Sequence, residues 1–447
     1  MTEPFFPDVP DRIPYASSGG QEPLAFKTYD PELSILGRRM ADWLRISVAY
    51  WHSFGWDGTD MFGRGTFDRP WDDKHLDPMA AARLKMAAAF EFIAKLGVPF
   101  YCFHDADVAP AGASFLESKA NLDALVDDAL RYQEETGVRL LWGTANLFSH
   151  PRYQAGAATN PDPAAFAYAA AQVSHMLAVT KRLGGENYVL WGGREGYDSL
   201  LNTDLRREGE QLARFLHLVA DEKHRIGFEG TLLIEPKPME PTKHQYDRDV
   251  AVVHGFLARH GLEGEYRVNI EANHATLAGH SFHHEVAYAA AHGLLGSIDA
   301  NRGDPQNGWD TDQFPNSVDD LVMPLYEIVQ GGGLGTGGFN FDAKRRRQSI
   351  DQVDLFHAHI GGIDTVARAL IVAARLADEG VLSAMKAERY AGWDAAIGAE
   401  ITAGSLRLAD LAGRVESGEL DPRPISGRQE LYECVVGDAV WAAGDRL

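Results

Sequence analysis

Short apolar stretches alternate along the chain with longer segments of helical periodicity. The short stretches are apolar almost throughout, which is typical of parallel strands buried on both faces. We expect eight such strands, at residues 45–51, 99–104, 138–144, 188–192, 231–236, 266–271, 295–299 and 338–342. Eight strand–helix units predict an α/β protein with a (β/α)8 TIM barrel.

The segments between these strands carry clear helix start and stop signals. Asp77 and Asp162 are each followed by proline, which places an N-cap before the residue preferred at the first helical position. Gly97 and Gly184 stand where these two helices should end. Further helices are expected at residues 121–136, 204–226, 247–260, 281–292, 317–329 and 363–378. The catalytic barrel is therefore expected to span residues 45–386.

Both ends of the chain fall outside this alternation. Residues 1–44 predict an N-terminal arm that is rich in proline at first and helical from about residue 30 to 44. From residue 387 the periodicity changes, and two short helices are expected at 400–418 and 429–443. This C-terminal tail cannot form a ninth barrel unit. We expect an arm outside the barrel, and composition alone leaves open whether it covers a neighbouring subunit or its own barrel.

Composition and charge narrow the possible partners. The 447 residues carry a formal net charge of −22, which argues against nucleic acid and anionic membrane surfaces as partners. There are two cysteines, far apart in sequence, so neither a disulfide framework nor a cysteine-ligated metal is expected. No apolar run is long enough to span a membrane, and the N-terminus lacks the layout of a signal peptide. A cytoplasmic location is the expectation.

Acids and a few basic residues stand at the C-terminal ends of the expected strands, where barrel enzymes carry their active sites. They follow five of the eight strands or lie in the loop after the seventh: His104, Asp107, Glu235, Lys237, Glu271, His274, Asp299, Asp310, Asp312 and Asp342. Each residue alone could be an ordinary loop residue without a function, because acids are common in loops. Their recurrence at strand after strand favours a site.

The spacing of these residues sets conditions on the local structure. Glu271 and His274 are three apart, so a continuous strand would place them on opposite faces. For both to reach one ion, the strand must end near Glu271 and the chain must turn before His274. Asp310 and Asp312 are two apart, so an extended backbone would direct both to one side.

The number of acids implies cations. Six carboxylates in a partly desolvated barrel mouth would repel one another severely, and Lys237 offsets a single charge. Two divalent ions would supply four positive charges. Carboxylate ligands with one imidazole favour hard ions, so we expect two Mg²⁺ per subunit, with Mn²⁺ or Co²⁺ as alternatives.

Long motifs around these residues resemble those of xylose isomerase. They are WGGREGYDSLLNTD (191–204), IEPKPMEPTKHQYD (234–247), NIEANHATLAGH (269–280), GSIDANRGD (296–304), GWDTDQFP (308–315), GGFNFDAK (337–344) and AHIGGIDTVARAL (358–370). The resemblance covers essentially residue 43 to the C-terminus, and the N-terminal arm is similar to that of the family's larger class. It implies the fold of a TIM barrel and a homotetramer whose tails wrap their partners.

The resemblance also implies a role for each residue. The first metal's ligands would be Glu235, Glu271, Asp299 and Asp342, and Glu271 would bridge to a second metal bound by His274, Asp310 and Asp312. His104 would act on the sugar ring, Asp107 would fix its tautomer, and Lys237 would contact the substrate oxygen at carbon one. Trp51, Trp191 and Thr144 would line the sugar pocket, and Phe62 would enter a neighbouring subunit's site.

The implied reaction interconverts D-xylose and D-xylulose, and also D-glucose and D-fructose, by ring opening and a metal-assisted 1,2-hydride shift. Three alternatives are less favoured. An epimerase on the same barrel fits the His104–Asp107 pair less well, a metal-dependent nuclease would want a basic surface, and a catalytically silent barrel would not retain every expected ligand. Outside the site, we expect His280 and His284 to be surface histidines. Residues 344–347 are expected to be either a solvated helix start or a basic run that forms salt bridges between subunits.

Overall fold

Eight parallel strands close into a barrel at the centre of the molecule. A computed structural model of the chain describes residues 3–16, 22–73 and 75–444. In chain order the barrel strands are β3 (Ser47–Ala49), β4 (Phe100–His104), β5 (Arg139–Thr144), β6 (Asn187–Trp191), β8 (Thr231–Glu235), β10 (Tyr266–Glu271), β11 (Leu295–Asp299) and β12 (Phe339–Phe341). Each pairs in parallel with the next barrel strand along the chain, and β12 returns to β3. The prediction of a (β/α)8 barrel is confirmed.

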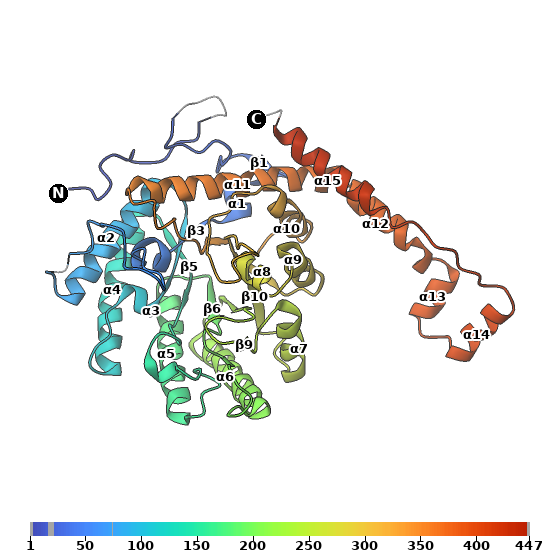
Figure 1. Cartoon of the computed structure of the whole chain (residues 1–447), viewed down its shortest axis with the longest axis horizontal. Helices are drawn as coiled ribbons and strands as arrows, with labels where there is room; N and C mark the ends of the chain where they lie inside the picture. The colour runs from blue at the N-terminus through green and yellow to red at the C-terminus, as the bar shows by residue number, and fades with distance from the viewer. Residues whose placement is uncertain (1–2, 17–21, 74, 445–447) are drawn as a thin grey trace.

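Helices surround the barrel on its outside (Figure 1). They are α2 (Pro78–Leu96), α4 (Phe115–Thr136), α5 (Pro163–Arg182), α6 (Leu205–Ile226), α7 (Val250–His260), α9 (Phe282–Ala291), α10 (Asp319–Gln330) and α11 (Val353–Glu379). The expected caps are present, because Asp77 accepts hydrogen bonds from Met79 and Ala80 and Gly97 ends α2 in the left-handed conformation. Inside the barrel, a small apolar cluster from β4, β5, β6 and β8 packs against Trp51 and supports the site from below.

The expected helix at residues 30–44 is wrong over most of its length. The chain instead forms a short antiparallel pair, β1 (Ser34–Ile35) and β2 (Arg38–Arg39), followed by the one-turn helix α1 (Met40–Leu44). Leu36 and Gly37, which join the two strands, both have positive φ and therefore form a tight turn that a helix cannot contain. The backbone N–H groups of residues 27–29 bind the carboxylate of Asp364 on α11, at 2.7–2.9 Å, and so fasten this arm to the barrel.

Two expected helix boundaries also differ from the structure. Helix α11 begins ten residues before the expected start, because Gly361 and Gly362 lie within it instead of breaking it. A Cβ at Gly362 would lie 2.8 Å from the ring of Phe341, so this glycine permits close packing of the helix on β12. The single helix expected at 400–418 is divided into α13 (Ala396–Thr402) and α14 (Leu408–Glu416), with Gly404 in the left-handed conformation between them.

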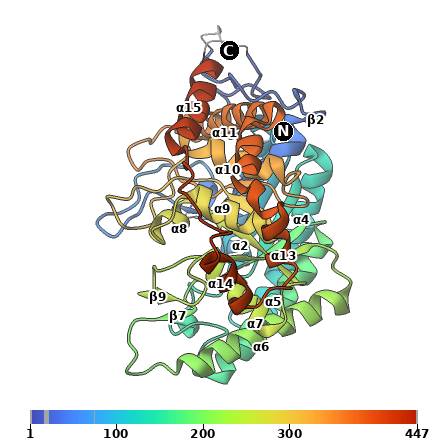
Figure 2. The same cartoon turned by 90° about the vertical axis from the view of Figure 1, so that its right-hand side faces the viewer.

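The C-terminal tail leaves the barrel and returns to it. After α11, helices α12 (Val381–Tyr390), α13 and α14 project away from the barrel, and α15 (Gln429–Gly444) runs back to pack against α11 (Figure 1). Seen from the side of the tail, α15 and α11 lie next to the N-terminal segment (Figure 2). Among the described residues, no helix has both the length and the apolar character needed to cross a membrane.

Candidate active site

The C-terminal ends of the barrel strands open onto a cavity of about 370 Å³. Glu235 and Glu271 are the last residues of β8 and β10, and His104 is the last residue of β4. The predicted site residues that line this cavity are Trp51, His104, Thr144, Trp191, Glu235, Lys237, Glu271, His274, Asp310, Asp312 and Asp342. Asp299, the last residue of β11, is fully buried behind these lining residues.

One group of four acids comes from the C-terminal ends of β8, β10, β11 and β12. Oxygens of Glu235, Glu271, Asp299 and Asp342 all lie within 4.8 Å of one another. Asn269 donates from one amide nitrogen to Glu235 and to Asp299, at 3.0 and 2.8 Å, and Asn340 donates to Asp299 at 2.9 Å. These amides orient the carboxylates without neutralising their charge.

A second group shares Glu271 with the first. Oxygens of Glu271, Asp310 and Asp312 lie within 4.8 Å of one another, and His274 Nε2 lies 3.0 Å from Glu271 and 3.1 Å from Asp310. The expected turn is present, because β10 ends at Glu271 and helix α8 (Ala272–Leu277) begins at the next residue. This helical turn places His274 on the same side as the carboxylate.

Asp310 and Asp312 converge by a different route from the one expected. Asp312 has a φ of 43°, in the left-handed region, so the backbone bends between the two acids instead of staying extended. A non-glycine residue held in this conformation is strained, and such strain is concentrated at functional sites. The carboxylate of Asp312 is fixed by Lys344 Nζ at 2.8 Å.

The acids carry more negative charge than the protein offsets. Burial raises the pKa values of Glu235, Glu271 and Asp299 well above their ordinary range, and repulsion from neighbouring carboxylates raises them further. Burial would lower the pKa of Lys237, but Asp310 and Glu271 outweigh it and raise the pKa. Two overlapping sets of oxygen-rich ligands with one shared carboxylate fit two divalent cations, which would relieve this repulsion.

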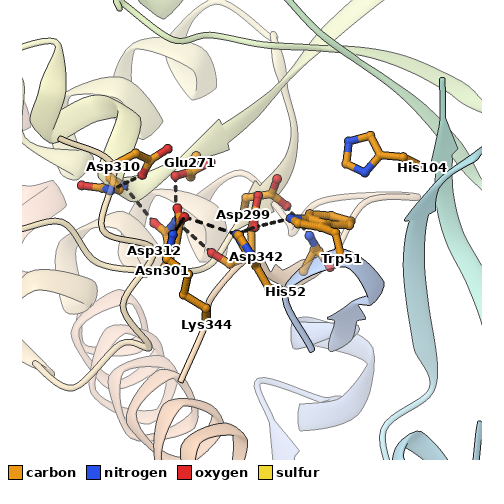
Figure 3. A network of polar contacts seen from close by, with 12 residues as sticks. Trp51, His52, His104, Glu271, Asp299, Asn301, Asp310, Asp312, Asp342 and Lys344 are labelled. Carbon is orange, nitrogen blue, oxygen red and sulfur yellow. Dashed lines mark hydrogen bonds and ion pairs between the residues drawn. The ribbon is translucent and has the colours of Figure 1, made fainter. Parts of the chain in front are cut away.

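Three residues belong to this network although they were not among the predicted site residues (Figure 3). One of them, Asn301, does follow Asp299 at the end of the seventh expected strand. His52 Nε2 lies 3.0 Å from Asp342 and 3.2 Å from Asp312, and although burial would lower its pKa, these two acids raise it to about 9. Asn301 donates to Glu271 at 2.7 Å. Lys344 binds Asp312, so the expectation that it is solvated is wrong. His52 follows Trp51 at the end of the first expected strand, and this position in the sequence could have identified it as a site residue.

His104 lies apart from the acids, beyond Trp51 (Figure 3), with the two ring centroids 4.7 Å apart. The short helix α3 (Asp105–Val108) begins directly after β4 and brings Asp107 back beneath the imidazole. Asp107 Oδ2 lies 2.8 Å from His104 Nδ1 and accepts the backbone N–H of His104 at 2.9 Å. This pairing commits Nδ1 and leaves Nε2 as the nitrogen available to a substrate.

Aromatic rings form the other side of the cavity. Trp51 donates from its indole nitrogen to Asp342 at 2.9 Å, and the rings of Phe148 and Trp191 meet edge to face at 4.5 Å. Thr144 lines the cavity, but its hydroxyl donates to the carbonyl of Val189 at 2.6 Å, so only its oxygen lone pairs are free to accept.

Phe62 is the predicted site residue that the structure places away from this cavity. Its side chain is 87% exposed on the loop that follows Trp51–Gly55, next to Met61 at 95%. Within this single chain, therefore, Phe62 does not complete the site.

Comparison with known proteins gives matches over nearly the whole chain. A xylose isomerase of Paraburkholderia xenovorans is 59% identical over 438 residues, covering 98% of this chain and 99% of the relative. A xylose isomerase of Burkholderia ambifaria is 60% identical over 437 residues, with 98% and 99% covered. Residues 386–440 match the family model described as the XylA2 C-terminal domain.

Solved structures show the same barrel at low sequence identity. A structure of L-ribulose 3-epimerase aligns with a TM-score of 0.51 at 15% identity, covering 76% of this chain and 98% of the epimerase. This similarity supports the fold alone. The near full-length identity of about 59%, in contrast, decides the family. The chain belongs to the xylose isomerase family.

Proposed function

We propose that this protein interconverts D-xylose and D-xylulose, and D-glucose and D-fructose, with two divalent cations per subunit. The observation that carries this proposal is the arrangement of one cavity, in which Glu271 belongs to two carboxylate groups and the His104–Asp107 pair stands opposite them. We also propose a cytoplasmic location, since Cys102 and Cys434 are both free thiols, as in proteins of reducing compartments.

The two carboxylate groups would each hold one ion. Glu235, Glu271, Asp299 and Asp342 would bind the first, and Glu271, His274, Asp310 and Asp312 the second. Hard oxygen donors predominate in both groups, which favours Mg²⁺, with Mn²⁺ or Co²⁺ as alternatives. When bound, such ions supply Lewis acidity to the sugar oxygens on carbons one and two.

The protein's own residues prepare the sugar for a 1,2-hydride shift. His104 Nε2 would take the proton of the hydroxyl on carbon one and return it to the ring oxygen as the bond between carbon one and that oxygen breaks, while Asp107 holds the tautomer. Lys237 would donate a hydrogen bond to the oxygen on carbon one and stabilise the negative charge that grows there. Trp51 and Trp191 would exclude water from the path of the hydride, and Thr144 Oγ1 would accept a hydrogen bond from the sugar.

Removal of metal tests the function directly. Treatment with EDTA should lower the rate of xylulose formation from D-xylose by about 10³-fold or more, because bound ions contribute several kcal/mol of transition-state stabilisation. Adding Mg²⁺, Mn²⁺ or Co²⁺ should restore the rate. Equal activity with and without EDTA would disprove the proposal.

The same assay run in D₂O distinguishes the hydride shift from a proton-transfer route. A direct shift between carbons one and two should leave carbon one of the product almost free of solvent deuterium. Substantial deuterium at this position, measured by NMR, would show that the proton of an enediol exchanges with water and would contradict the hydride step.

We further propose a homotetramer in which the site of each subunit is completed by a neighbour. Two exposed apolar regions support this assembly. Phe62 and Met61 are almost fully exposed on one loop. The projecting tail exposes Leu408 and Ile425 at 85% and 82%, and the returning helix α15 exposes Trp441 at 82%. Apolar exposure of this extent marks a surface that another protein covers. Phe62 would enter a neighbour's sugar pocket, and the tail would wrap a partner subunit.

Co-expression of two inactive variants tests whether Phe62 acts across an interface. Phe62→Ala and His104→Asn should each be poorly active alone. In a mixed pair, the subunit with intact His104 would receive Phe62 from its partner. One of the two sites of the pair would then be complete. With half of the pairs mixed, the activity should recover to about one quarter of the parent value.

As the control, the two variants are expressed and purified separately and then mixed, so that their subunits do not exchange. If co-expression gives no more activity than this mixture, Phe62 does not complete a neighbouring site.

A further inference from the structure

A second cluster of metal-binding side chains lies outside the barrel mouth, where α8, α9 and α7 meet. His280 directly precedes Ser281, the N-cap of α9, and His284 and Glu285 lie in the first turns of that helix. Nitrogens of the two histidines and an oxygen of Glu285 all lie within 4.8 Å of one another, and the two imidazole centroids are 4.7 Å apart. Both histidines lie at the surface, as expected, but they lie close to each other and to Glu285.

A second carboxylate stands beside this cluster. Asp249, the N-cap of α7, has its Oδ2 3.6 Å from His280 Nε2, and its Oδ1 accepts the N–H of Val252 at 2.8 Å. One carboxylate oxygen of Glu285 is also occupied, because its Oε2 accepts a hydrogen bond from the N–H of Val250 at 2.8 Å. Its Oε1 lies 4.0 Å from His284 Nε2. Each acid thus has one structural oxygen and one that faces a histidine.

The charge at this position is incompletely balanced. Asp249 and Glu285 are 7% and 3% exposed, and Arg248 lies 3.3 Å from Asp249. Burial raises the pKa of Glu285, and Asp249 raises it further, although the N–H of Val250 and the two histidines act to lower it. Two buried carboxylates facing two imidazoles, with one guanidinium nearby, would be stabilised by an additional cation.

The donor set differs in character from that of the barrel mouth. Two imidazoles and one carboxylate are the ligands of borderline ions such as Zn²⁺ and Ni²⁺, whereas oxygen-rich sets bind Mg²⁺. We propose that His280, His284 and Glu285 form a third metal site for such an ion, with Asp249 as the carboxylate partner of His280. Ligand atoms around zinc lie about 3.3 Å apart, so binding needs a small contraction, which the half-exposed His284 side chain permits.

The position of the cluster gives the ion a structural role. Glu285 lines a small pocket together with Glu271, His274 and Ala278. An ion bound by His280, His284 and Glu285 would join the end of the α8 segment to the start of α9. It would thereby stiffen the chain that carries His274.

Zinc counting on matched variants tests this site. Full-length protein stripped with EDTA and equilibrated with Zn²⁺ should retain, after gel filtration, one more zinc per chain than His284→Ala. His283→Ala is the matched control, because His283 lies on the same helix but contacts Glu327 at 3.3 Å. It should retain as much zinc as the parent. The ions of the barrel mouth contribute equally to all three proteins, so the difference does not depend on the proposed function.

A second measurement locates the ion. Anomalous diffraction at the zinc edge should show a peak between His280, His284 and Glu285 in the parent protein and none in His284→Ala. His280→Asn should lose the same zinc. It takes the place of His284→Ala if His284→Ala does not fold. Equal zinc contents in the parent and in the folded variant, or no anomalous peak in the parent, would overturn the third site.

Discussion

Replacing Glu271 with glutamine should weaken the binding of both divalent ions and lower kcat/KM for D-xylose by about 10³-fold or more. Glu271 contributes an oxygen to the group with Glu235 and Asp342 and to the group with Asp310 and Asp312. A neutral amide removes the charge from both groups at once. Among the described acids, Glu271 alone belongs both to the group of four carboxylates and to the group of three. No other single substitution should therefore have this double effect.

Titration of the stripped protein with Mn²⁺, followed by calorimetry, measures the two affinities separately. His274→Asn should weaken mainly the second ion, because His274 Nε2 faces Glu271 and Asp310. Glu222→Gln on α6 is the matched chemical control, because Glu222 bonds Ser174 and Arg225 outside this cavity, and it should leave both affinities nearly unchanged. If Glu271→Gln bound both ions as tightly as the parent, the bridging role would be wrong.

The metal-free form of Glu271→Gln provides a check on folding. Burial and neighbouring acids raise the pKa of Glu271, so its ionised form is disfavoured in the folded state. The amide removes this cost and can still accept the hydrogen bond that Asn301 donates at 2.7 Å. The melting temperature of the stripped variant at neutral pH should therefore be at least that of the stripped parent. A lower value would mean that lost activity reflects lost structure.

The barrel and the strand-end residues could be predicted from the sequence because both depend on local pattern. A parallel strand buried on both faces needs a continuous apolar run, and side chains at its C-terminal end must face the barrel mouth. Glu235, Glu271 and Asp299 each end a strand, as the pattern predicts. Their convergence into two overlapping groups follows from closure of the barrel.

The rest depends on long-range contacts that local pattern does not encode. Lys344 binds Asp312, an acid 32 residues earlier that adopts a left-handed conformation, whereas its basic neighbours suggested a solvated run. The cluster at His280 includes Asp249 as a neighbour, and this residue caps α7 and lies 31 residues earlier in the chain. Helix α11 passes through Gly361 and Gly362 because tight packing on Phe341 outweighs their low helix propensity.

Replacing Lys237 with methionine should lower kcat by about 10²- to 10³-fold without weakening metal binding. Lys237 Nζ lies 2.7 Å from Asp310 and 5.2 Å from the ring centroid of Trp191, between the second carboxylate group and the aromatic wall. A cation there can stabilise charge on a sugar oxygen. Removing it frees the Asp310 carboxylate and removes a positive charge beside the second ion, so the ion's affinity should rise or stay the same.

Lys344→Met distinguishes contact of a lysine with the sugar from the effect of its charge on the second metal group. Lys344 Nζ lies 2.8 Å from Asp312, so its loss also removes one positive charge beside the second carboxylate group. Its effect on Mn²⁺ affinity should therefore resemble that of Lys237→Met, whereas kcat should fall by no more than a few-fold. An equal loss of kcat in both variants would show that the general charge balance of the metal site governs the rate. A loss confined to Lys237→Met would instead require direct contact between that ammonium group and the reacting sugar.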